Sequence, residues 1–300
     1  SSRPFIATRE GPRQRPILPI PYALARRPHA CLASARDRAR RSINARENSR
    51  MTETVTAAIL VIGDEILSGR TKDKNIGFIA EYLTAIGIDL KEVRVVPDEM
   101  EEIVAAVNVL RKRSTYLFTT GGIGPTHDDI TADAVASAMG LELYEDQRII
   151  ALMLERLKPE DLNEARRRMA RIPRGAEHVA NPISKVPGFM IENVIVMAGV
   201  PSIMQVMLEN VTPRLKTGVK LQSVSVDSGG LPEGIYASGL GAIQKEHPDV
   251  IIGSYPHFDG QTFRNQIVLR GRNSETLKNA QEAVSAMLKT LAESDKTIPL

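Results

Sequence analysis

The chain has 300 residues and is 42% hydrophobic, enough for two domains with a sizeable core. No stretch approaches the roughly twenty apolar residues that cross a bilayer, so we expect no membrane partner and a cytoplasmic location. The single cysteine, Cys31, excludes an internal disulfide and a zinc site built from several thiolates.

Charge is distributed unevenly along the chain. The formal net charge is +3, but residues 1–50 contain twelve arginines and three acids, which gives +9 there and leaves −6 for the rest. An acidic body with 4% aromatic residues and no tryptophan lacks the cationic face and stacking platforms of a nucleic-acid binder. We therefore predict no nucleic-acid partner.

Residues 1–50 read as a basic, disordered leader. Arginine-rich, acid-poor sequence is typical of an organelle transit segment. We favour a second interpretation, an upstream extension without structure and with Met51 as the working start, because the first predicted strand begins a few residues later. Pro16, Pro19 and Pro21 interrupt the only segment that resembles a signal-peptide core.

Strands and helices alternate from residue 56 onward. Continuous apolar runs at 56–62 and 116–118 predict buried strands, and helical spacing of apolar residues predicts the helices between the strands. The predicted strands cover residues 56–62, 89–96 and 116–118, and the predicted helices cover 73–86 and 100–111. This order predicts an α/β fold with a doubly wound, mostly parallel sheet, whose ligands bind beyond the carboxyl ends of the strands.

Acidic residues follow each of these strands. Asp64 and Glu65 follow the first, Asp98 follows the second, and Asp128 and Asp129 follow the third. Mg²⁺ prefers one or two carboxylates together with phosphate oxygens and water, so a shared site for Mg²⁺ or another divalent cation such as Co²⁺ is predicted. The alternative is that Asp64 and Asp98 only cap the helices that follow them.

The third strand runs into a glycine turn that reads Thr-Thr-Gly-Gly-Ile-Gly-Pro-Thr-His-Asp-Asp-Ile-Thr over residues 119–131. Gly121, Gly122 and Gly124 permit positive φ and let backbone N–H groups approach a phosphate. The spacing matches neither a P-loop nor a full dinucleotide-binding fingerprint, and a plain strand-to-helix connection also uses such residues. We interpret the turn as a phosphate cradle, with Asp128 or a bound metal activating the attacking water.

The middle of the chain is predicted to be helical over residues 146–157 and 160–172. The second helix carries a run of arginines: Arg166, Arg167, Arg168, Arg171 and Arg174. We interpret this run as a solvated face; an anion-facing or subunit-facing role is the alternative. A buried strand over 194–197 and a helix over 202–215 close the first domain, which we place at residues 51–218.

Residues 219–300 are predicted to form a small α+β domain of the order βαββα. The strands are expected at 221–226, 250–254 and 263–269, with a turn at Asp259 and Gly260, and the helices at 232–245 and 275–291. A unit of this size is too small to be an enzyme alone, so we expect it to cover the first domain or to form a dimer contact.

Several ordered motifs in these two domains resemble a known family. They are Ile-Gly-Asp-Glu-Ile-Leu-Ser-Gly at 62–69, Val-Val-Pro-Asp-Glu at 95–99, the glycine turn, Pro-Gly-Phe at 187–189 and Gly-Ser-Tyr-Pro at 253–256. They look like the molybdopterin-binding (MoaB/Mog-like) domain family. Within it they are most similar to the competence/damage-inducible protein A group and to the amino-terminal domain of eukaryotic FAD synthases.

The resemblance implies metal-dependent chemistry on a small nucleotide or pterin, in a homo-oligomer. In the molybdopterin adenylyltransferase branch, the matching catalytic acids are Asp98 and Asp129, with Thr131. In the other two branches, the domain is associated with pyrophosphatase activity on ADP-ribose or FAD. We therefore predict a Mg²⁺-dependent nucleotide pyrophosphatase, with molybdopterin binding or adenylyl transfer as one alternative and a non-catalytic pterin or nucleotide carrier as another.

The predicted site residues divide by role. Asp98, Asp128 and Asp129 are the predicted catalytic residues, and Asp64, Asp98 and Asp129 the predicted metal ligands. The predicted substrate-binding residues are Ser68, Gly69, Gly121, Gly122, Gly124, Thr131, Lys185, Gly199 and Pro201. Two departures from the family pattern affect substrate choice: Ala198 replaces a proline, and Ser184 with Lys185 replaces a glycine-containing stretch.

Overall fold

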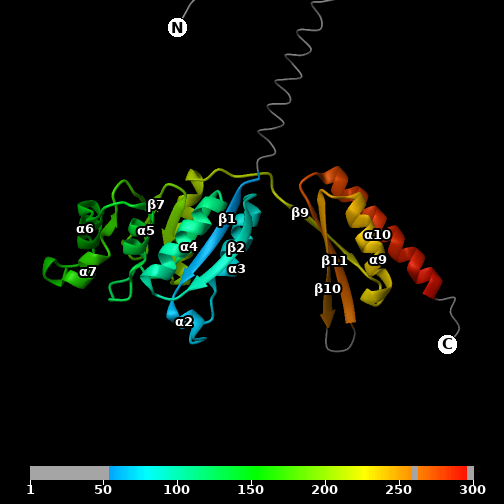
Figure 1. The fold of residues 1–300 in the computed structure, drawn as a ribbon, viewed down its shortest axis with the longest axis horizontal. Coiled ribbons are helices and arrows are strands. Elements are labelled where there is room, and N and C mark those ends of the chain that lie inside the picture. Colours follow the sequence, from blue (N-terminus) through cyan, green and yellow to red (C-terminus); the bar gives the residue numbers. More distant parts are fainter. Residues whose placement is uncertain (1–53, 259–262, 296–300) are drawn as a thin grey trace, which may run out of the picture. The chain divides into compact units, whose positions relative to one another are not determined.

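The computed structural model describes residues 54–258 and 263–295 (Figure 1). The predicted leader at 1–50 and the predicted turn at Asp259 and Gly260 lie outside these ranges. No helix in the described ranges is long and apolar enough to span a membrane.

A six-stranded sheet organises residues 54–217, with the strand order β2-β1-β3-β8-β7-β6. The first four strands are parallel, and β7 and β6 are antiparallel additions. The bounds are β1 Thr56–Ile62, β2 Asp89–Val96, β3 Tyr116–Thr120, β8 Val194–Met197, β7 Gly188–Ile191 and β6 Glu177–Val179. The predicted α/β fold with a mostly parallel sheet is confirmed.

Helices cover both faces of this sheet. They are α3 Asn75–Ala85, α4 Met100–Arg113, α5 Thr131–Met139, α6 Gln147–Leu154 and α8 Pro201–Val211, with the single turn α2 Asp64–Leu67 after β1. Alternate residues of β1 belong to two separate cores: Leu60 packs with residues of α4 and α5, and Ile59 packs with residues of α3 and α8. Because each β1 side chain is buried on one face or the other, the strand is apolar throughout, as a doubly wound sheet requires.

Strand register brings the carboxyl ends of the parallel strands together. Ile62 pairs with Val96, Val61 pairs with Thr120, and Thr120 pairs with Met197. The segments that follow β1, β2, β3 and β8 therefore leave the sheet along one edge. This is the edge at which parallel α/β sheets bind ligands.

The predicted helix over 160–172 is wrong. This segment forms a 3-10 turn η1 Pro159–Asp161, the short helix α7 Glu164–Arg168 and the strand β5 Arg171–Pro173. β5 pairs with β4 Leu143–Glu145, and Ile172 is buried in the core. A strand partner almost thirty residues away in the chain overrides the local helical preference of the arginine-rich sequence.

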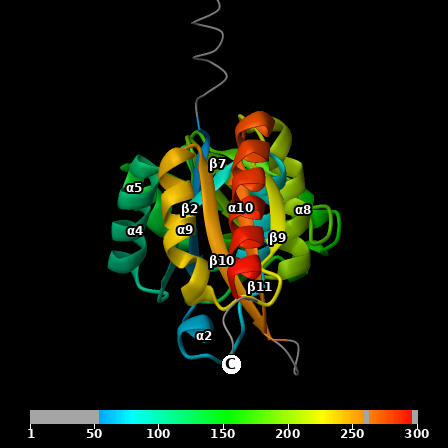
Figure 2. The same cartoon turned by 90° about the vertical axis from the view of Figure 1, so that its right-hand side faces the viewer.

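The predicted βαββα order of the second part is confirmed. It consists of β9 Gln222–Asp227, α9 Glu233–Glu246, β10 Val250–Phe258, β11 Phe263–Gly271 and α10 Ser274–Asp295. The three strands form an antiparallel sheet of order β10-β11-β9. Figure 2 shows α9 and α10 lying over one face of this sheet, where Tyr236 and Leu277 share a core with Ile267.

Candidate functional site

The turn after β3, residues 121–130, is called the β3 turn here. Gly121 and Gly122 have φ angles of 102° and 66°, the left-handed region that favours glycine. A Cβ on Gly121 would overlap the carbonyl oxygen of Ile62, and one on Gly122 would overlap the hydroxyl of Thr131. The backbone therefore passes where no side chain fits, as predicted for these two residues.

Two details of this turn differ from the sequence-based interpretation. Gly124 has no positive φ; its constraint is the Asp129 carboxylate, which a Cβ would meet at 2.6 Å. The N–H of Gly121 donates to the carbonyl of Met197 at 3.3 Å, so it is not available to a phosphate. Within the described part of the chain, the N–H groups of Gly122 and Gly124 have no acceptor, and these two remain for a ligand.

Thr131 stabilises the β3 turn through two hydrogen bonds. Its hydroxyl donates to the carbonyl of Gly121 at 2.9 Å, and its N–H donates to the carbonyl of Gly122 at 3.0 Å. The side chain is fully buried and lines none of the three cavities described below. Thr131 therefore shapes the turn, and direct contact with a ligand requires a rearrangement.

The turn after β8, residues 198–200, lies directly beside the β3 turn. A Cβ on Gly199 would come within 3.3 Å of the Cα of Gly121. The side-chain amide of Asn75, at the start of α3, donates to the carbonyl of Gly199 at 2.8 Å. Pro201 then begins α8. Asn75 was missed by sequence reasoning; an asparagine buried at the first turn of an amphipathic helix looks like an ordinary capping residue until its partner is known.

A cavity of about 890 Å³, called the large cavity, opens along both turns. Gly121, Gly122, Gly124, Gly199 and Pro201 all line it, which brings most of the predicted substrate-binding residues together. Its charged lining residues are two acids, Glu65 and Asp129, and two bases, Arg156 and Arg166. The two arginines were not predicted as site residues.

A second cavity of about 250 Å³, called the side cavity, shares Glu65, Gly121, Gly199 and Pro201 with the large one. Asn75 and Thr120 also line it. Their side-chain oxygens, Oδ1 of Asn75 and Oγ1 of Thr120, are buried without a hydrogen-bond partner in the structure. Since buried polar atoms are normally paired, this cavity presents polar groups that a ligand or water would satisfy.

Asp98 lies among the acids that follow β1 and β3. The backbone N–H of Asp64 donates to its Oδ2 at 3.0 Å. Burial raises the pKa of Asp98 above its usual value, and the negative charges of Asp64, Glu65 and Asp128 add to the rise. Asp98 therefore feels the charges of Asp64, Glu65 and Asp128, whereas Asp129, the other predicted metal ligand, is not among the charges that act on it.

Asp129 is held within its own turn. Its Oδ2 accepts hydrogen bonds from the N–H of Thr126 at 2.8 Å and from the Thr126 hydroxyl at 2.5 Å. The neighbouring Asp128 is exposed, and the Thr126 hydroxyl beside it holds the pKa of Asp128 below its usual range. Asp128 is thus a carboxylate at neutral pH that is open to solvent.

These acids suit a hard cation that takes its remaining ligands from elsewhere. Across the described ranges, no three acids, histidines or cysteines are close enough to form a complete metal site. Mg²⁺ needs only one or two carboxylates when phosphate oxygens and water supply the rest. A cation beside Asp98 would also relieve the repulsion that raises its pKa. The donor set therefore fits magnesium bound together with a phosphate.

Three predicted substrate-binding residues lie away from the cavities. Ser68 and Gly69 follow α2 on the surface, and neither lines the large cavity, the side cavity or the cavity beside Asp133. Lys185 is outside the large cavity as well, and its ammonium group pairs with Glu155 at 2.8 Å. These three residues therefore do not contribute to the lining of the large cavity.

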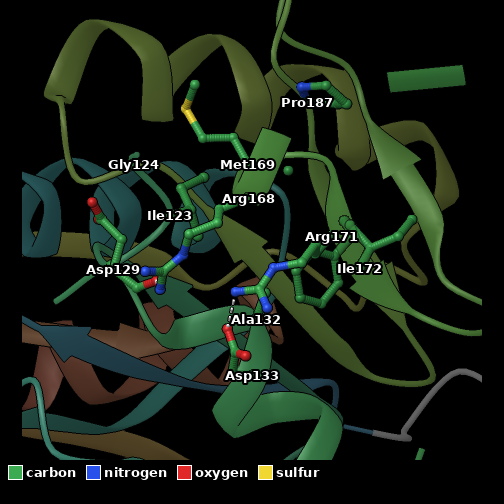
Figure 3. Close-up of a pocket in the computed structure, with 13 residues that line it drawn as sticks. Ile123, Gly124, Asp129, Ala132, Asp133, Arg168, Met169, Arg171, Ile172 and Pro187 are labelled. Carbon is green, nitrogen blue, oxygen red and sulfur yellow. Dashed lines mark hydrogen bonds and ion pairs between the residues drawn. The ribbon is translucent and has the colours of Figure 1, made fainter. Parts of the chain in front are cut away.

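A small cavity of about 20 Å³ lies on the other side of Asp129 and is lined by Arg168 and Arg171 (Figure 3). Arg171 pairs with Asp133 at 3.0 Å. Arg168 reaches toward Asp129, where its guanidinium is 3.5 Å from the backbone carbonyl. This volume is about that of one water molecule, so the small cavity is not a substrate site.

Comparison with known proteins agrees with this architecture. Residues 58–217 match the family model described as "Probable molybdopterin binding domain", and residues 228–295 match "FAD synthase, middle domain". A protein of Archaeoglobus fulgidus is 33% identical over 230 residues, which cover 77% of this chain and 96% of that protein.

Two further relatives show the same pattern. A "Probable FAD synthase" of Caenorhabditis briggsae is 31% identical over 258 residues, which cover 78% of this chain but 49% of that protein. The crystal structure of CinA from Thermoplasma acidophilum, described as having unknown function, is 32% identical with a TM-score of 0.51, covering 53% of this chain and 96% of that one. The chain therefore belongs to the molybdopterin-binding domain family, in a form that also carries a FAD synthase middle domain.

Proposed function

We propose that this protein is a metal-dependent nucleotide pyrophosphatase that hydrolyses a dinucleotide such as ADP-ribose or FAD. The observation that carries the proposal is the large cavity, because it combines free main-chain N–H groups, carboxylates and guanidinium groups at one sheet edge. Its volume of about 890 Å³ is within the range of small-molecule sites and is large enough for a dinucleotide. The match to a FAD synthase middle domain supports a flavin or adenine dinucleotide as substrate class.

The proposed roles follow from the contacts of each residue. The N–H groups of Gly122 and Gly124 bind diphosphate oxygens, and Thr131 and Thr126 hold the β3 turn in the shape that presents them. One or two of the carboxylates of Asp64, Asp98 and Asp129 would hold a divalent cation, which when bound supplies positive charge to the phosphate oxygens.

Asp128 is the proposed proton acceptor for the attacking water. The oxygen of this water forms a bond to one phosphorus, and the bond from that phosphorus to the bridging oxygen breaks. The bridging oxygen leaves with the second phosphate, and the water proton passes to the Asp128 carboxylate. The lowered pKa of Asp128 keeps it ionised at neutral pH, so its carboxylate can accept a hydrogen bond that orients the water and then take the proton as the new bond forms.

The direct test uses the purified full-length chain with ADP-ribose, FAD and other dinucleotides, with Mg²⁺ or Co²⁺. Released mononucleotides are separated by chromatography, and the same panel is run with Asp129→Asn and with Asp98→Asn. Hydrolysis that depends on the metal and on both acids supports the proposal. Tight binding of the same dinucleotides without any product would reject it.

The alternative function is molybdopterin binding or adenylyl transfer, which the family model over residues 58–217 favours. In that reaction a pterin phosphate would attack ATP, and the same β3 turn would hold the triphosphate. The unpaired oxygens of Asn75 and Thr120 in the side cavity suit a ring that presents N–H groups, as a pterin does. Formation of an adenylylated pterin from ATP, with no dinucleotide hydrolysis, would select this alternative.

A further inference from the structure

Seven arginines lie between residues 141 and 190, and they fall into two groups. Four of them pair with carboxylates: Arg148 with Asp146, Arg167 with Glu145, Arg171 with Asp133 and Arg174 with Glu142. The other three, Arg156, Arg166 and Arg168, have no carboxylate partner among the described residues. Two members of the second group, Arg156 and Arg166, reach the large cavity.

Arg156 and Arg166 both line the large cavity, and none of the four paired arginines does. Each of the two makes one hydrogen bond to a backbone carbonyl, Arg156 to Ile183 and Arg166 to Asp161. A guanidinium group has five N–H donors in a planar fork, so most donors of both side chains remain available. Arg166 is half-buried, where an uncompensated positive charge is unfavourable until an anion joins it.

Two acids, Glu155 and Glu145, do not neutralise these two arginines. Glu155 precedes Arg156 in the chain, but its carboxylate pairs with Lys185 at 2.8 Å. Glu145 accepts hydrogen bonds from Nε and Nη2 of Arg167, on α7, at 2.9 and 2.6 Å. Glu155 and Glu145 are thus occupied by other cations.

We propose that Arg156 and Arg166, called the arginine pair, bind a phosphate group of the ligand in the large cavity. Planar guanidinium groups recognise phosphate oxygens through paired hydrogen bonds, and the cavity brings the pair together with the N–H groups of Gly122 and Gly124. This inference rests on the proposed function in one respect: it takes the ligand to be a diphosphate-containing nucleotide. It makes the pair a specificity determinant that favours diphosphates over uncharged nucleosides.

The test measures binding of inorganic diphosphate to the full-length protein by isothermal titration calorimetry, in chelator so that no metal contributes. Arg166→Gln and Arg156→Gln are each expected to weaken binding about tenfold, since a hydrogen bond to a charged group is lost. Arg166→Lys keeps the charge without the fork and should fall between. Adenosine, which has no phosphate, should bind each variant as it binds the original protein.

Arg167→Gln is the matched control, because Arg167 is adjacent on α7 but pairs with Glu145 outside the large cavity. It should leave diphosphate affinity unchanged. The inference is overturned if the protein does not bind diphosphate, if the arginine-pair variants bind it normally, or if Arg167→Gln weakens it equally. Thermal unfolding of each variant separates lost binding from lost folding.

The two proposals fail separately. Absence of dinucleotide hydrolysis, with diphosphate binding that still requires Arg156 and Arg166, rejects the pyrophosphatase and keeps the arginine pair as an anion site. Hydrolysis that proceeds at the original kcat/KM in both arginine variants keeps the enzyme and rejects the pair.

Discussion

Two parts of the chain line the large cavity, and they are built differently. The ends of β3 and β8 contribute main-chain N–H groups and the Asp129 carboxylate, in turns whose backbones touch each other. The segment around α6 and α7 contributes guanidinium groups from short elements. The first part is fixed by sheet register, whereas the second depends on which arginines find carboxylate partners elsewhere. We call the first part the strand side and the second part the helix side. Strand pairing holds the backbone of the strand side, whereas the net charge of the helix side depends on which of its arginines are paired.

The largest expected effect tests the strand side. Asp129→Asn keeps an acceptor for Thr126 but removes the charge, so the β3 turn should persist while hydrolysis falls by about 10²- to 10³-fold, as for loss of one transition-state contact. Steady-state kinetics with the best dinucleotide gives kcat/KM. Glu101→Gln, an exposed acid on α4, removes the same charge and should leave the rate unchanged. A rate loss in Glu101→Gln of similar size would show a general charge effect.

Gly121→Ala tests whether glycine is required at this position because the backbone lies close to Ile62 or only because of its positive φ. The substitution forces a left-handed φ on alanine and also drives its Cβ into the Ile62 carbonyl. We expect the free energy of unfolding to fall by more than about 1 to 3 kcal/mol, the range for backbone strain alone.

Gly140→Ala is the control for Gly121→Ala. Gly140 has a φ of 65° and open space where its Cβ would be, so it carries the conformational cost without the overlap. Urea unfolding of both variants isolates the steric part. Equal losses in the two variants would show that the contact with Ile62 has no energetic consequence.

The part of the site that could be predicted from sequence is the strand side. The strands predicted at 56–62, 89–96 and 194–197 have the bounds observed for β1, β2 and β8, and parallel pairing then puts Asp98 and the β3 turn at the same edge of the sheet. The helix side was misread, because its structure depends on distant partners. Ile172 pairs in β5 with Tyr144, and Arg174 with Glu142, each about thirty residues away. A run of arginines does not reveal which members those partners will neutralise.

Asp146 tests how the helix side is held. It accepts from the N–H of Arg148 at the start of α6 and bonds to Tyr144 and His178. The Arg148 guanidinium holds the pKa of Asp146 well below its usual range. Asp146→Asn should therefore lower the free energy of unfolding at neutral pH by about 1 to 3 kcal/mol.

The pH dependence of this loss has a definite sign. Because the folded pKa of Asp146 is lowered, its stabilisation is present above the unfolded value of about 4 and is lost as the pH falls below it. The difference between the original protein and Asp146→Asn should narrow under acid conditions. Urea unfolding across this range measures it, and a difference that stays constant with pH would mean that the ionised carboxylate is not what holds α6.

The smallest expected effect is that of Asp98→Asn on stability, and it is opposite in sign to that of Asp146→Asn. The folded pKa of Asp98 is raised, so its contribution to stability is present at low pH and is lost as the pH rises through that value. At neutral pH in chelator, Asp98→Asn should therefore raise the unfolding midpoint slightly, since it removes a charge repelled by Asp64 and Asp128. Added Mg²⁺ should stabilise the original protein more than the variant, because the cation binds the folded state through that carboxylate. Thermal unfolding with and without Mg²⁺ tests this. Equal shifts of the unfolding midpoint in both proteins would mean that these acids do not hold a cation. A shift confined to the original protein would mean that cation binding relieves the repulsion among them.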